Sequence, residues 1–534
     1  MSVTHSDPSG APVLSNDEEE TQSGRGEADE ARKTPPVSLT RLRVIVFFVG
    51  AASLGAEISA ARLLAPYFGA STIIWANTIA TVLVALSVGY AIGGGLADRR
   101  RDLRGLCALV VSAAVLLAVV PFVSGPFLHL SVNALGALSI GGFLGSLAAV
   151  LVLVAVPVLL LGAVAPYANR LALGTVADTG KVTGRLYAIS TAGSLLGTFA
   201  SALLLIPLIG THRTFLVFAL ALALVAAPGL GARAFLAIPV VIAGLMAVPP
   251  AAVGAGRSDA RVIYETETPY QYARVVQLRS GERWLQLNEG VAVHSDYRPW
   301  SYLTGGYWDD FLVLPAAGAR GVPSRIAILG NAAGTTARAY GHFFPRTRVD
   351  AVELDGKLTS IGRKYFDLTG PRLHVYTADA RPWLAATHDR YDAILLDAYR
   401  QPYIPFYLLT KEFFASVRSH LRPGGMLAVN VGHIPGSNHL EQVVTRTLRA
   451  VFPAVVRDPL SAANTLVAAS TAAVTQQQLF ARRLSLPPAL GPLANDVGAR
   501  LAAALPGGSV FTDDRAPVEW LTDLSIVQYA TSAG

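Results

Sequence analysis

Four short apolar runs between Arg325 and Asp397 each end at a small residue or a carboxylate. The residues at these ends are Gly330, Glu353, Asp379 and Asp397. A glycine lets the backbone approach a ligand closely, while a carboxylate accepts hydrogen bonds or takes up a proton. Helical patterns separate the runs, which is typical of a parallel sheet with helices on both faces. Because ligands bind at the carboxyl ends of such strands, we expect the four residues to line one crevice.

The loop from Gly330 to Gly334 and the acid Glu353 together indicate a nucleoside site. The loop lacks a G-x-G-x-x-G pattern and contains no lysine, which argues against a dinucleotide site and a phosphate-binding P-loop. Small residues after a strand also serve tight helix–strand packing. Glu353 is placed to accept hydrogen bonds from both ribose hydroxyls, or to cap the next helix. Asp379 with Ala380 could bind an adenine amino group, or cap a helix in the same way.

Asp397 is the carboxylate that we predict to be catalytic. It stands where the apolar run Ile394–Leu396 stops. A carboxylate at the mouth of an apolar crevice can act as a general base or hold a cationic substrate. A helix cap is the alternative role, but Pro402 and Pro405 delay the next helix to about Thr410. That spacing weakens the cap interpretation.

The composition is that of a membrane protein. The chain has 534 residues, of which 52% are hydrophobic and only 15% charged, against about 25% charged in soluble domains. The apolar residues concentrate between Leu42 and Pro250, where runs near the roughly 20 residues that a bilayer requires predict membrane spans. We place them at about 42–64, 73–96, 105–128, 143–167 and 187–209. The stretch 213–250 is divided at Pro228 into two segments that are each short for a full crossing.

Basic residues are distributed unevenly among the loops between these spans. The loops 98–104 and 170–185 are basic, whereas 65–72 and 129–142 contain no Lys or Arg. By the positive-inside rule, the basic loops and the amino terminus are cytoplasmic. An even number of crossings would then leave the C-terminal half inside the cell, and an odd number outside. The net charge of +7 has its simplest source in these loops and does not indicate nucleic-acid binding.

The expected fold is a multi-span α-helical membrane domain followed by an α/β Rossmann-like domain with a small antiparallel β unit before it. Glu57 and Arg62 lie in the first span, either as an ion pair that fixes helix packing or as part of a polar binding or transport site. Cys107 is the single cysteine, which excludes an internal disulfide and a cysteine metal cluster. The expected domains are a disordered tail at 1–40, the transmembrane domain at 41–250, three short strands and a connector at 258–322, and the Rossmann-like domain at 323–534.

Several segments together resemble the spermidine synthase (polyamine aminopropyltransferase) family in its membrane-fused bacterial form. Glu-Thr-Pro-Tyr-Gln at 267–271 is similar to a family segment whose Gln contacts the nucleoside, and Leu-Asn-Glu-Gly at 287–290 stands where the family has Leu-x-Asp-Gly. Glu353 matches the ribose-binding Glu of the family, and Asp379 with Ala380 its adenine-binding pair. Asp397 matches the first Asp of Asp-Ser-Ser-Asp-Pro, the catalytic position.

This resemblance implies transfer of an aminopropyl group from decarboxylated S-adenosylmethionine, as co-substrate, to a small-molecule amine. Asp397 would be the general base, with no prosthetic group and no metal. Membrane lipid and a second copy of the chain are further expected partners. Because the donor is made in the cytoplasm, we expect a multi-pass protein of the cell membrane whose C-terminal domain faces the cytoplasm. The donor would be held by Gln271, Gly330, Gly334, Glu353, Asp379 and Ala380, and the acceptor by Tyr270, Asp296 and Tyr399.

The chain departs from the family on the acceptor side. The loop 330–334 reads Gly-Asn-Ala-Ala-Gly where the family has Gly-Gly-Gly-Asp-Gly, so the Asp that helps hold the donor's free amine is missing. Arg400 and Gln401 replace the second Asp of the catalytic motif, which puts a cation where a diamine should be held. One alternative is a methyltransferase whose intact S-adenosylmethionine presents a carboxylate to Arg400. Another is a non-catalytic transporter or sensor with a nucleoside-binding domain.

Overall fold

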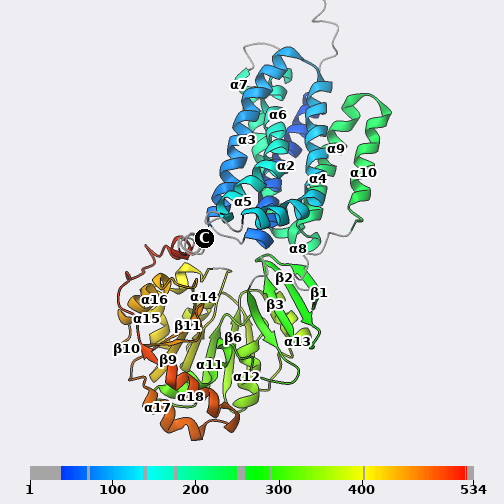
Figure 1. The fold of residues 1–534 in the computed structure, drawn as a ribbon. Helices are drawn as coiled ribbons and strands as arrows, with labels where there is room; N and C mark the ends of the chain where they lie inside the picture. The colour runs from blue at the N-terminus through cyan, green and yellow to red at the C-terminus, as the bar shows by residue number, and fades with distance from the viewer. Residues whose placement is uncertain are drawn as a thin grey trace, which may run out of the picture.

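The structure is a computed structural model, and it describes residues 38–68, 72–135, 141–172, 179–248, 259–288, 292–400, 403–522 and 525. Long apolar helices form a bundle at one end of the molecule, and an α/β part with two sheets lies at the other (Figure 1). The predicted tail lies almost wholly outside the described residues, so its disorder stays a prediction.

The described residues contain six helices that are long and apolar enough to cross a membrane. Two of them are continuous runs in which a π-helical turn joins shorter α-helices. The prediction that both halves of 213–250 are short is wrong for the first half, since Thr211–Leu230 is long enough to span. The elements are α2 (Leu39–Phe68), α3 (Thr72–Arg99), α4 (Leu103–Leu135), α5 (Gly141–Val150) with α6 (Val156–Ala172), α7 (Thr179–Phe199) with α8 (Ile206–Ile209), α9 (Thr211–Ala226) and the shorter α10 (Ala237–Leu245).

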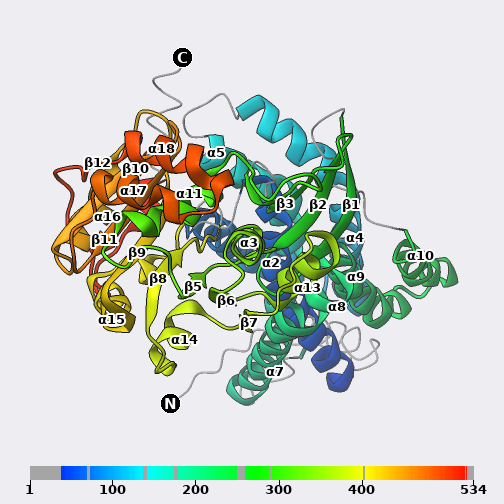
Figure 2. The same cartoon turned by 90° about the horizontal axis from the view of Figure 1, so that it is seen from below.

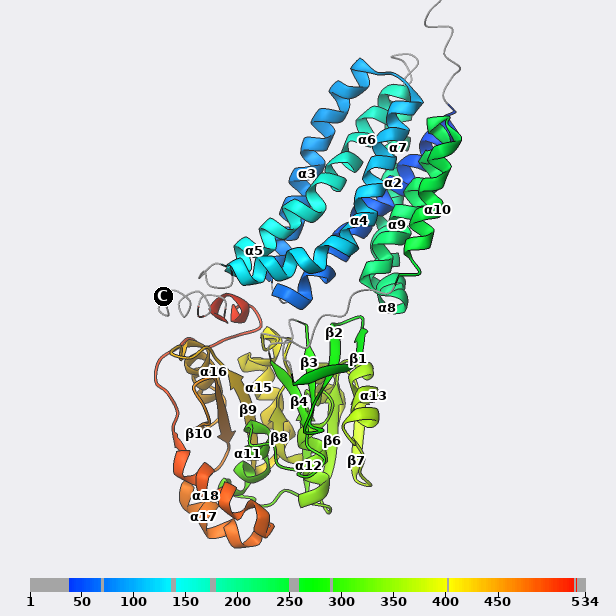
Figure 3. The ribbon, with the colours of Figure 1, turned by 45° about the vertical axis from the view of Figure 1, so that its right-hand side comes forward.

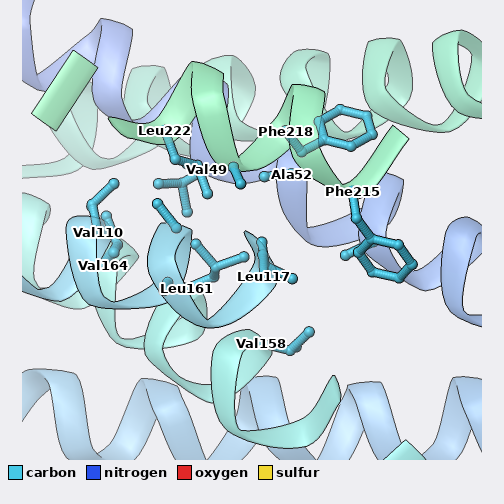
Figure 4. Close-up of a cluster of buried hydrophobic side chains, with 14 of the residues drawn as sticks. Val49, Ala52, Val110, Leu117, Val158, Leu161, Val164, Phe215, Phe218 and Leu222 are labelled. Atoms are coloured by element: carbon cyan, nitrogen blue, oxygen red, sulfur yellow. The ribbon is translucent and has the colours of Figure 1, made fainter. Parts of the chain in front are cut away.

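Close packing of small residues and branched apolar side chains holds the bundle together. Helix α2 lies at its centre, and Val49 and Ala52 of α2 meet side chains of α4, α6 and α9 (Figure 4). The backbone of α7 approaches α2 so closely that a Cβ on Gly193 would lie 2.1 Å from the carbonyl oxygen of Phe47. Such small-residue contacts are the usual means by which helices associate in lipid, where no hydrophobic force drives them together.

The basic segments of the bundle converge at the end that lies away from the α/β part. Arg170 forms an ion pair with Asp98 at 3.0 Å, and the Tyr167 hydroxyl donates to the carbonyl oxygen of Arg100. The start of α2 is at this same end, and α10 runs beside α9 back toward the α/β part (Figures 1 and 3). With α10 as a seventh, shorter pass after the six long ones, the α/β part lies at the end opposite the basic loops.

The main sheet has eight strands in the order β12-β10-β11-β9-β8-β5-β6-β7. Strands β5 to β9 are parallel, and β11 and β10 are added antiparallel to their neighbours. The four apolar runs identified in the sequence are β5, β6, β7 and β8, so the Rossmann-like fold class is confirmed. The bounds are β5 (Arg325–Leu329), β6 (Arg348–Glu353), β7 (Leu373–Thr377), β8 (Tyr391–Leu396), β9 (Leu421–Gly432), β10 (Ala454–Pro459), β11 (Asn464–Ser470) and β12 (Ala502–Ala503).

Amphipathic helices cover both faces of this sheet and bury two apolar cores (Figure 2). Strands β5 and β8 contribute side chains to both cores, which is why they are apolar at nearly every position. One face is covered by α14 (Ala380–Ala386), α15 (Lys411–His420) and α16 (His439–Arg449), and the other by α11 (Tyr307–Val313), α12 (Thr335–Phe343), α17 (Gln476–Arg482) and α18 (Gly491–Arg500).

The smaller sheet is antiparallel and has the strand order β1-β2-β3-β4. Three of its strands match those expected from the sequence, and the fourth, β4, was missed. Its apolar face packs on α13 (Gly356–Tyr365), with Leu285 and Leu358 in one buried cluster. The bounds are β1 (Ala260–Glu267), β2 (Tyr272–Leu278), β3 (Arg283–Leu287) and β4 (Val293–Tyr297).

Candidate active site

A cavity of about 450 Å³ lies between the carboxyl ends of the parallel strands and the end of the helix bundle. This size is within the range of small-molecule sites. Most of the residues singled out from the sequence line it together, which they do because the carboxyl ends of parallel strands meet at one edge. The predicted residues in the lining are Tyr270, Gln271, Gly330, Glu353, Asp379, Ala380, Asp397 and Tyr399.

The loop after β5 is built for close backbone approach. Gly330 has φ of +90°, and a Cβ there would lie 2.4 Å from the carbonyl oxygen of Asp397. Gly334 has φ of +95° and begins α12, where a Cβ would lie 2.3 Å from Leu368. Only glycine fits both positions without strain. Gly334 is not part of the cavity lining, so its role is to shape the loop and not to contact a ligand directly.

Glu353 ends β6 and is held by backbone amides on both carboxylate oxygens. Its Oε2 accepts from the Ala332 amide at 2.7 Å, and its Oε1 accepts from the Asp355 amide at 2.9 Å. Burial raises the pKa of Glu353 to about 7, although these two hydrogen bonds act in the opposite direction. The cap of α13 is Asp355, which accepts from the Lys357 amide at 3.0 Å. Glu353 is therefore not the helix cap, and its remaining lone pairs face the cavity.

Asp379 is a helix cap, one of the two roles that the sequence left open, and it also lines the cavity. Its Oδ1 accepts from the Arg381 amide at 3.0 Å and so caps α14. Its Oδ2 accepts from the Tyr407 hydroxyl at 2.8 Å, and both residues line the cavity. The side chain is thus fixed in place by the helix that it caps.

Asp397 follows β8 and lines the cavity at the strand ends. Its Oδ2 accepts from the Tyr307 hydroxyl at 3.1 Å, and its Oδ1 accepts from the Asn430 amide nitrogen at 2.9 Å. Burial raises the pKa of Asp397 to about 7, and these hydrogen bonds only partly offset that rise. No helix begins here, because α15 starts at Lys411 with Thr410 as its cap. The structure therefore argues against the helix-cap interpretation of Asp397.

A second cavity of about 430 Å³ shares three lining residues with the first and includes Asn430, which bonds Asp397. Tyr307, Tyr399 and His294 line both cavities. The Tyr399 hydroxyl donates to the carbonyl oxygen of Asn430 at 3.0 Å and accepts from the Gly432 amide at 2.6 Å. Burial lowers the pKa of His294 to about 4, so its imidazole is neutral. This cavity is lined by aromatic, amide and imidazole groups and lies next to the carboxylate.

The segment after β1 joins the cavity to the membrane bundle. Gln271 is buried and lines the cavity beside Tyr270. Four positions before Gln271, Glu267 accepts hydrogen bonds from the backbone amide and the hydroxyl of Thr211, the first residue of α9. A carboxylate at a helix N-terminus is electrostatically favourable. Arg62 of α2 donates to the carbonyl oxygen of Thr268.

The bundle itself forms one wall of the cavity, which the sequence did not reveal. Arg62 lies in this wall, and among the described residues no ion pair joins it to Glu57 or to any other carboxylate. The interpretation of Glu57 and Arg62 as an ion pair is therefore wrong for the described residues. The wall consists of Ile58, Arg62, Trp75, Ala202 and Ile206.

One predicted acceptor residue is absent from the cavity lining. Asp296 lies in β4, where its carboxylate is 3.3 Å from the Arg298 guanidinium, and its backbone amide donates to the Thr335 hydroxyl. Tyr307 and Asn430, which hold the Asp397 carboxylate, were missed. Asn430 was visible only as a polar residue within the apolar run of β9. Among the described residues no group of three potential ligands is arranged to hold a metal ion.

The fold and the site define a class: a Rossmann-like α/β domain with a cavity at the carboxyl ends of its strands, joined to a bundle of long apolar helices. The sequence matches the family description "Spermine/spermidine synthase domain" over residues 314–478. A probable polyamine aminopropyl transferase of Bifidobacterium longum is 35% identical over 226 residues, covering 42% of this chain and 48% of the relative. A polyamine aminopropyltransferase of a Synechococcus species is 30% identical over 224 residues, covering 36% of this chain and 70% of the relative.

The chain belongs to the spermidine synthase (polyamine aminopropyltransferase) family. The matched region spans about half the length of the Bifidobacterium relative, 48% of which is covered. Among solved structures, a probable spermidine synthase of Corynebacterium glutamicum matches with 20% identity and a TM-score of 0.35, over 48% of this chain and 99% of that one.

Proposed function

We propose that the protein transfers an aminopropyl group from decarboxylated S-adenosylmethionine to an amine, with Asp397 as general base. The observation that carries this proposal is a buried carboxylate, Asp397, in the cavity at the strand ends, hydrogen-bonded by Tyr307 and Asn430, which also line a second cavity. Membership of the family supports the same reaction.

The chemistry makes modest demands on the protein. The sulfonium makes the adjacent methylene carbon electrophilic, so the protein must place donor and amine in line and keep the amine unprotonated. Glu353 and Asp379 face the region where the ribose and adenine of the donor would lie. Asp397, with a pKa of about 7, can take the amine proton near neutral pH. The Tyr307 and Asn430 hydrogen bonds orient its carboxylate.

The test begins with calorimetry on the purified full chain, using decarboxylated and intact S-adenosylmethionine side by side. Tighter binding of the decarboxylated form is the expected result. Turnover is then measured as methylthioadenosine release over a set of amines. The change Asp397→Asn should keep donor affinity and lower turnover by about 100-fold or more, as for loss of a general base. No binding of either nucleoside would refute the proposal.

Methyl transfer from intact S-adenosylmethionine is the second candidate. Arg400 lines the cavity, and the acid of the family's glycine loop is absent. An arginine would attract the carboxylate that the intact donor carries and the decarboxylated one lacks. Tighter binding of the intact form in the same titration would favour this reaction.

The location of the α/β part follows from the distribution of charge. Six helices that are long and apolar enough to cross a membrane support a multi-pass membrane protein. Donor synthesis in the cytoplasm predicted a cytoplasmic α/β part. The basic loops, however, gather at the opposite end of the bundle, and the positive-inside rule assigns that end to the cytoplasm. We therefore propose that the α/β part lies on the non-cytoplasmic side, where the donor would have to be supplied.

A further inference from the structure

Apart from Arg62, the bundle wall of the cavity is apolar. Ile58, Trp75, Ala202 and Ile206 face the cavity. Beside Ala202 and Ile206 in sequence, the leucines at 203, 204 and 208 are 66%, 57% and 76% exposed on the outside of the bundle. In a bilayer, such exposed leucines contact acyl chains. A single layer of helix therefore separates the cavity from the lipid.

Two arginines line this cavity, and neither forms an ion pair with a carboxylate among the described residues. Arg62 uses one of its five N–H donors on the carbonyl oxygen of Thr268, and no described carboxylate pairs with it. The nearby carboxylate of Glu267 is occupied by Thr211. Arg400 lines the cavity and has no ion pair among the described residues. The cavity thus has positive charge available for an anionic group.

The two guanidinium groups favour an acceptor that carries an acid beside its amine. The same lining also contains the carboxylates Glu353, Asp355, Asp379, Asp397 and Glu519, so a polyamine would meet attraction from these groups and repulsion from Arg62 and Arg400. An arginine in a partly desolvated site binds phosphate or carboxylate strongly through paired N–H donors. A ligand complementary to this cavity has an amine that lies near Asp397 and an acidic group that pairs with the arginines. It also has an apolar part that packs against the bundle wall.

We propose that the acceptor is an aminophospholipid headgroup, with Arg62 as the residue that recognises its phosphate. This inference rests on the proposed aminopropyl transfer. The lone pair of the lipid amine attacks the methylene carbon next to the sulfonium, and a nitrogen–carbon bond forms. The carbon–sulfur bond breaks, its electron pair stays on sulfur, and methylthioadenosine leaves. The proton released from the new ammonium passes to the Asp397 carboxylate.

The experiment uses the full chain reconstituted in vesicles, with donor labelled in the aminopropyl group. One set of vesicles contains phosphatidylethanolamine in phosphatidylcholine, and the other contains phosphatidylcholine alone. Free phosphoethanolamine and putrescine are tested as soluble acceptors with the second set. We expect label in the lipid phase of the first set only, in a molar ratio of one to the methylthioadenosine released.

Substitutions at Arg62 test whether this residue recognises the lipid phosphate. Arg62→Gln should lower lipid labelling by about tenfold or more while donor affinity is unchanged, and Arg62→Lys should retain part of it. Arg213→Gln is the matched control, because Arg213 is in α9 near the same end of the bundle but does not line the cavity. Its labelling should equal that of the wild type.

The outcomes separate this inference from the proposed function. Transfer to putrescine without lipid labelling would overturn the lipid inference and leave aminopropyl transfer standing. Transfer to free phosphoethanolamine as efficient as to the lipid would keep the recognition of phosphate and overturn the membrane source. A loss of donor affinity in Arg62→Gln would assign Arg62 to the donor and overturn its role here. No methylthioadenosine from any acceptor would overturn both proposals.

Discussion

Asp397 owes its proposed reactivity to burial that its hydrogen bonds do not fully offset. Its ordinary pKa is 3.8, and the site raises it to about 7. Below that pH the carboxyl is protonated and cannot accept the amine proton, so turnover should fall as pH drops through about 7. The measurement is the pH profile of methylthioadenosine release at saturating acceptor. A profile that is flat between pH 6 and about 8 would contradict the assignment of Asp397 as base.

Asn430 influences the pH at which turnover falls, which is called the acidic limb of the pH profile. Its side-chain amide donates to Asp397 at 2.9 Å and so favours the charged carboxylate. In Asn430→Ala the charged form loses this donor, so the pKa rises and the limb should move to higher pH by about one unit, given about 1.5 kcal/mol for a hydrogen bond to a charged group. Asn495→Ala, on the surface of α18, should leave the limb in place. An unmoved limb in Asn430→Ala would show that this contact does not stabilise the carboxylate.

The loops that follow β5 and β8 pass close to each other, and this close approach depends on Gly330. In Gly330→Ala, the positive φ and the 2.4 Å approach to the Asp397 carbonyl oxygen force the loops apart. The expected cost is about 1–3 kcal/mol of strain, together with weaker donor binding because Gly330 lines the cavity. Calorimetry of donor binding and thermal unfolding measure the two effects.

Gly341→Ala provides the control for that substitution. Gly341 is exposed in α12, and the nearest atom to an added Cβ is the Thr369 carbonyl oxygen at 3.9 Å. Alanine in a helix is favoured over glycine, so stability should be unchanged or slightly higher. If both alanine variants behaved alike, loop geometry would not be the reason for glycine at 330.

Helix α9 is joined to the α/β part through Glu267. Its carboxylate accepts from the backbone and hydroxyl of Thr211, and burial raises the pKa of Glu267. Glu267→Gln removes the charge that the helix N-terminus favours, so the segment 267–271 should open more often. Hydrogen exchange in this segment is expected to be about tenfold faster. Glu282→Gln, in the turn before β3, should leave that exchange rate unchanged.

Much of the site could be predicted because each donor-side residue ends a strand. Glu353, Asp379 and Asp397 are close together for the same reason that their strands are parallel. Asn430 could not be assigned, since it faces Asp397 only because β9 pairs with β8, with Leu396 opposite Val429. Arg62 could not be assigned either, because its place depends on how the bundle docks on β1. The local pattern of apolar residues is enough to predict the strands. The contacts of Asn430 and Arg62 depend instead on the order of the strands in the sheet and on how the bundle packs against it.

At the scale of the whole molecule, the orientation in the membrane decides how the site is supplied. The start of α2 and the basic loops lie at one end of the bundle, and the α/β part lies at the other. Moving arginines to the non-cytoplasmic side is unfavourable during insertion, so the arrangement predicts a non-cytoplasmic α/β part. A phosphatase reporter fused at Gly534 should then be active, and a fluorescent reporter that folds only in the cytoplasm should be dark.

The same orientation makes a prediction about activity in intact cells. Right-side-out spheroplasts supplied with external decarboxylated S-adenosylmethionine should release methylthioadenosine at the rate seen after detergent treatment, because the cavity is already on the exposed side. Spheroplasts that carry Asp397→Asn give the background release of methylthioadenosine. If activity appears only after detergent, the α/β part is cytoplasmic and the basic loops face outward. The bundle would then violate the positive-inside rule, and the cytoplasmic origin of the donor would outweigh the loop charges in deciding the orientation.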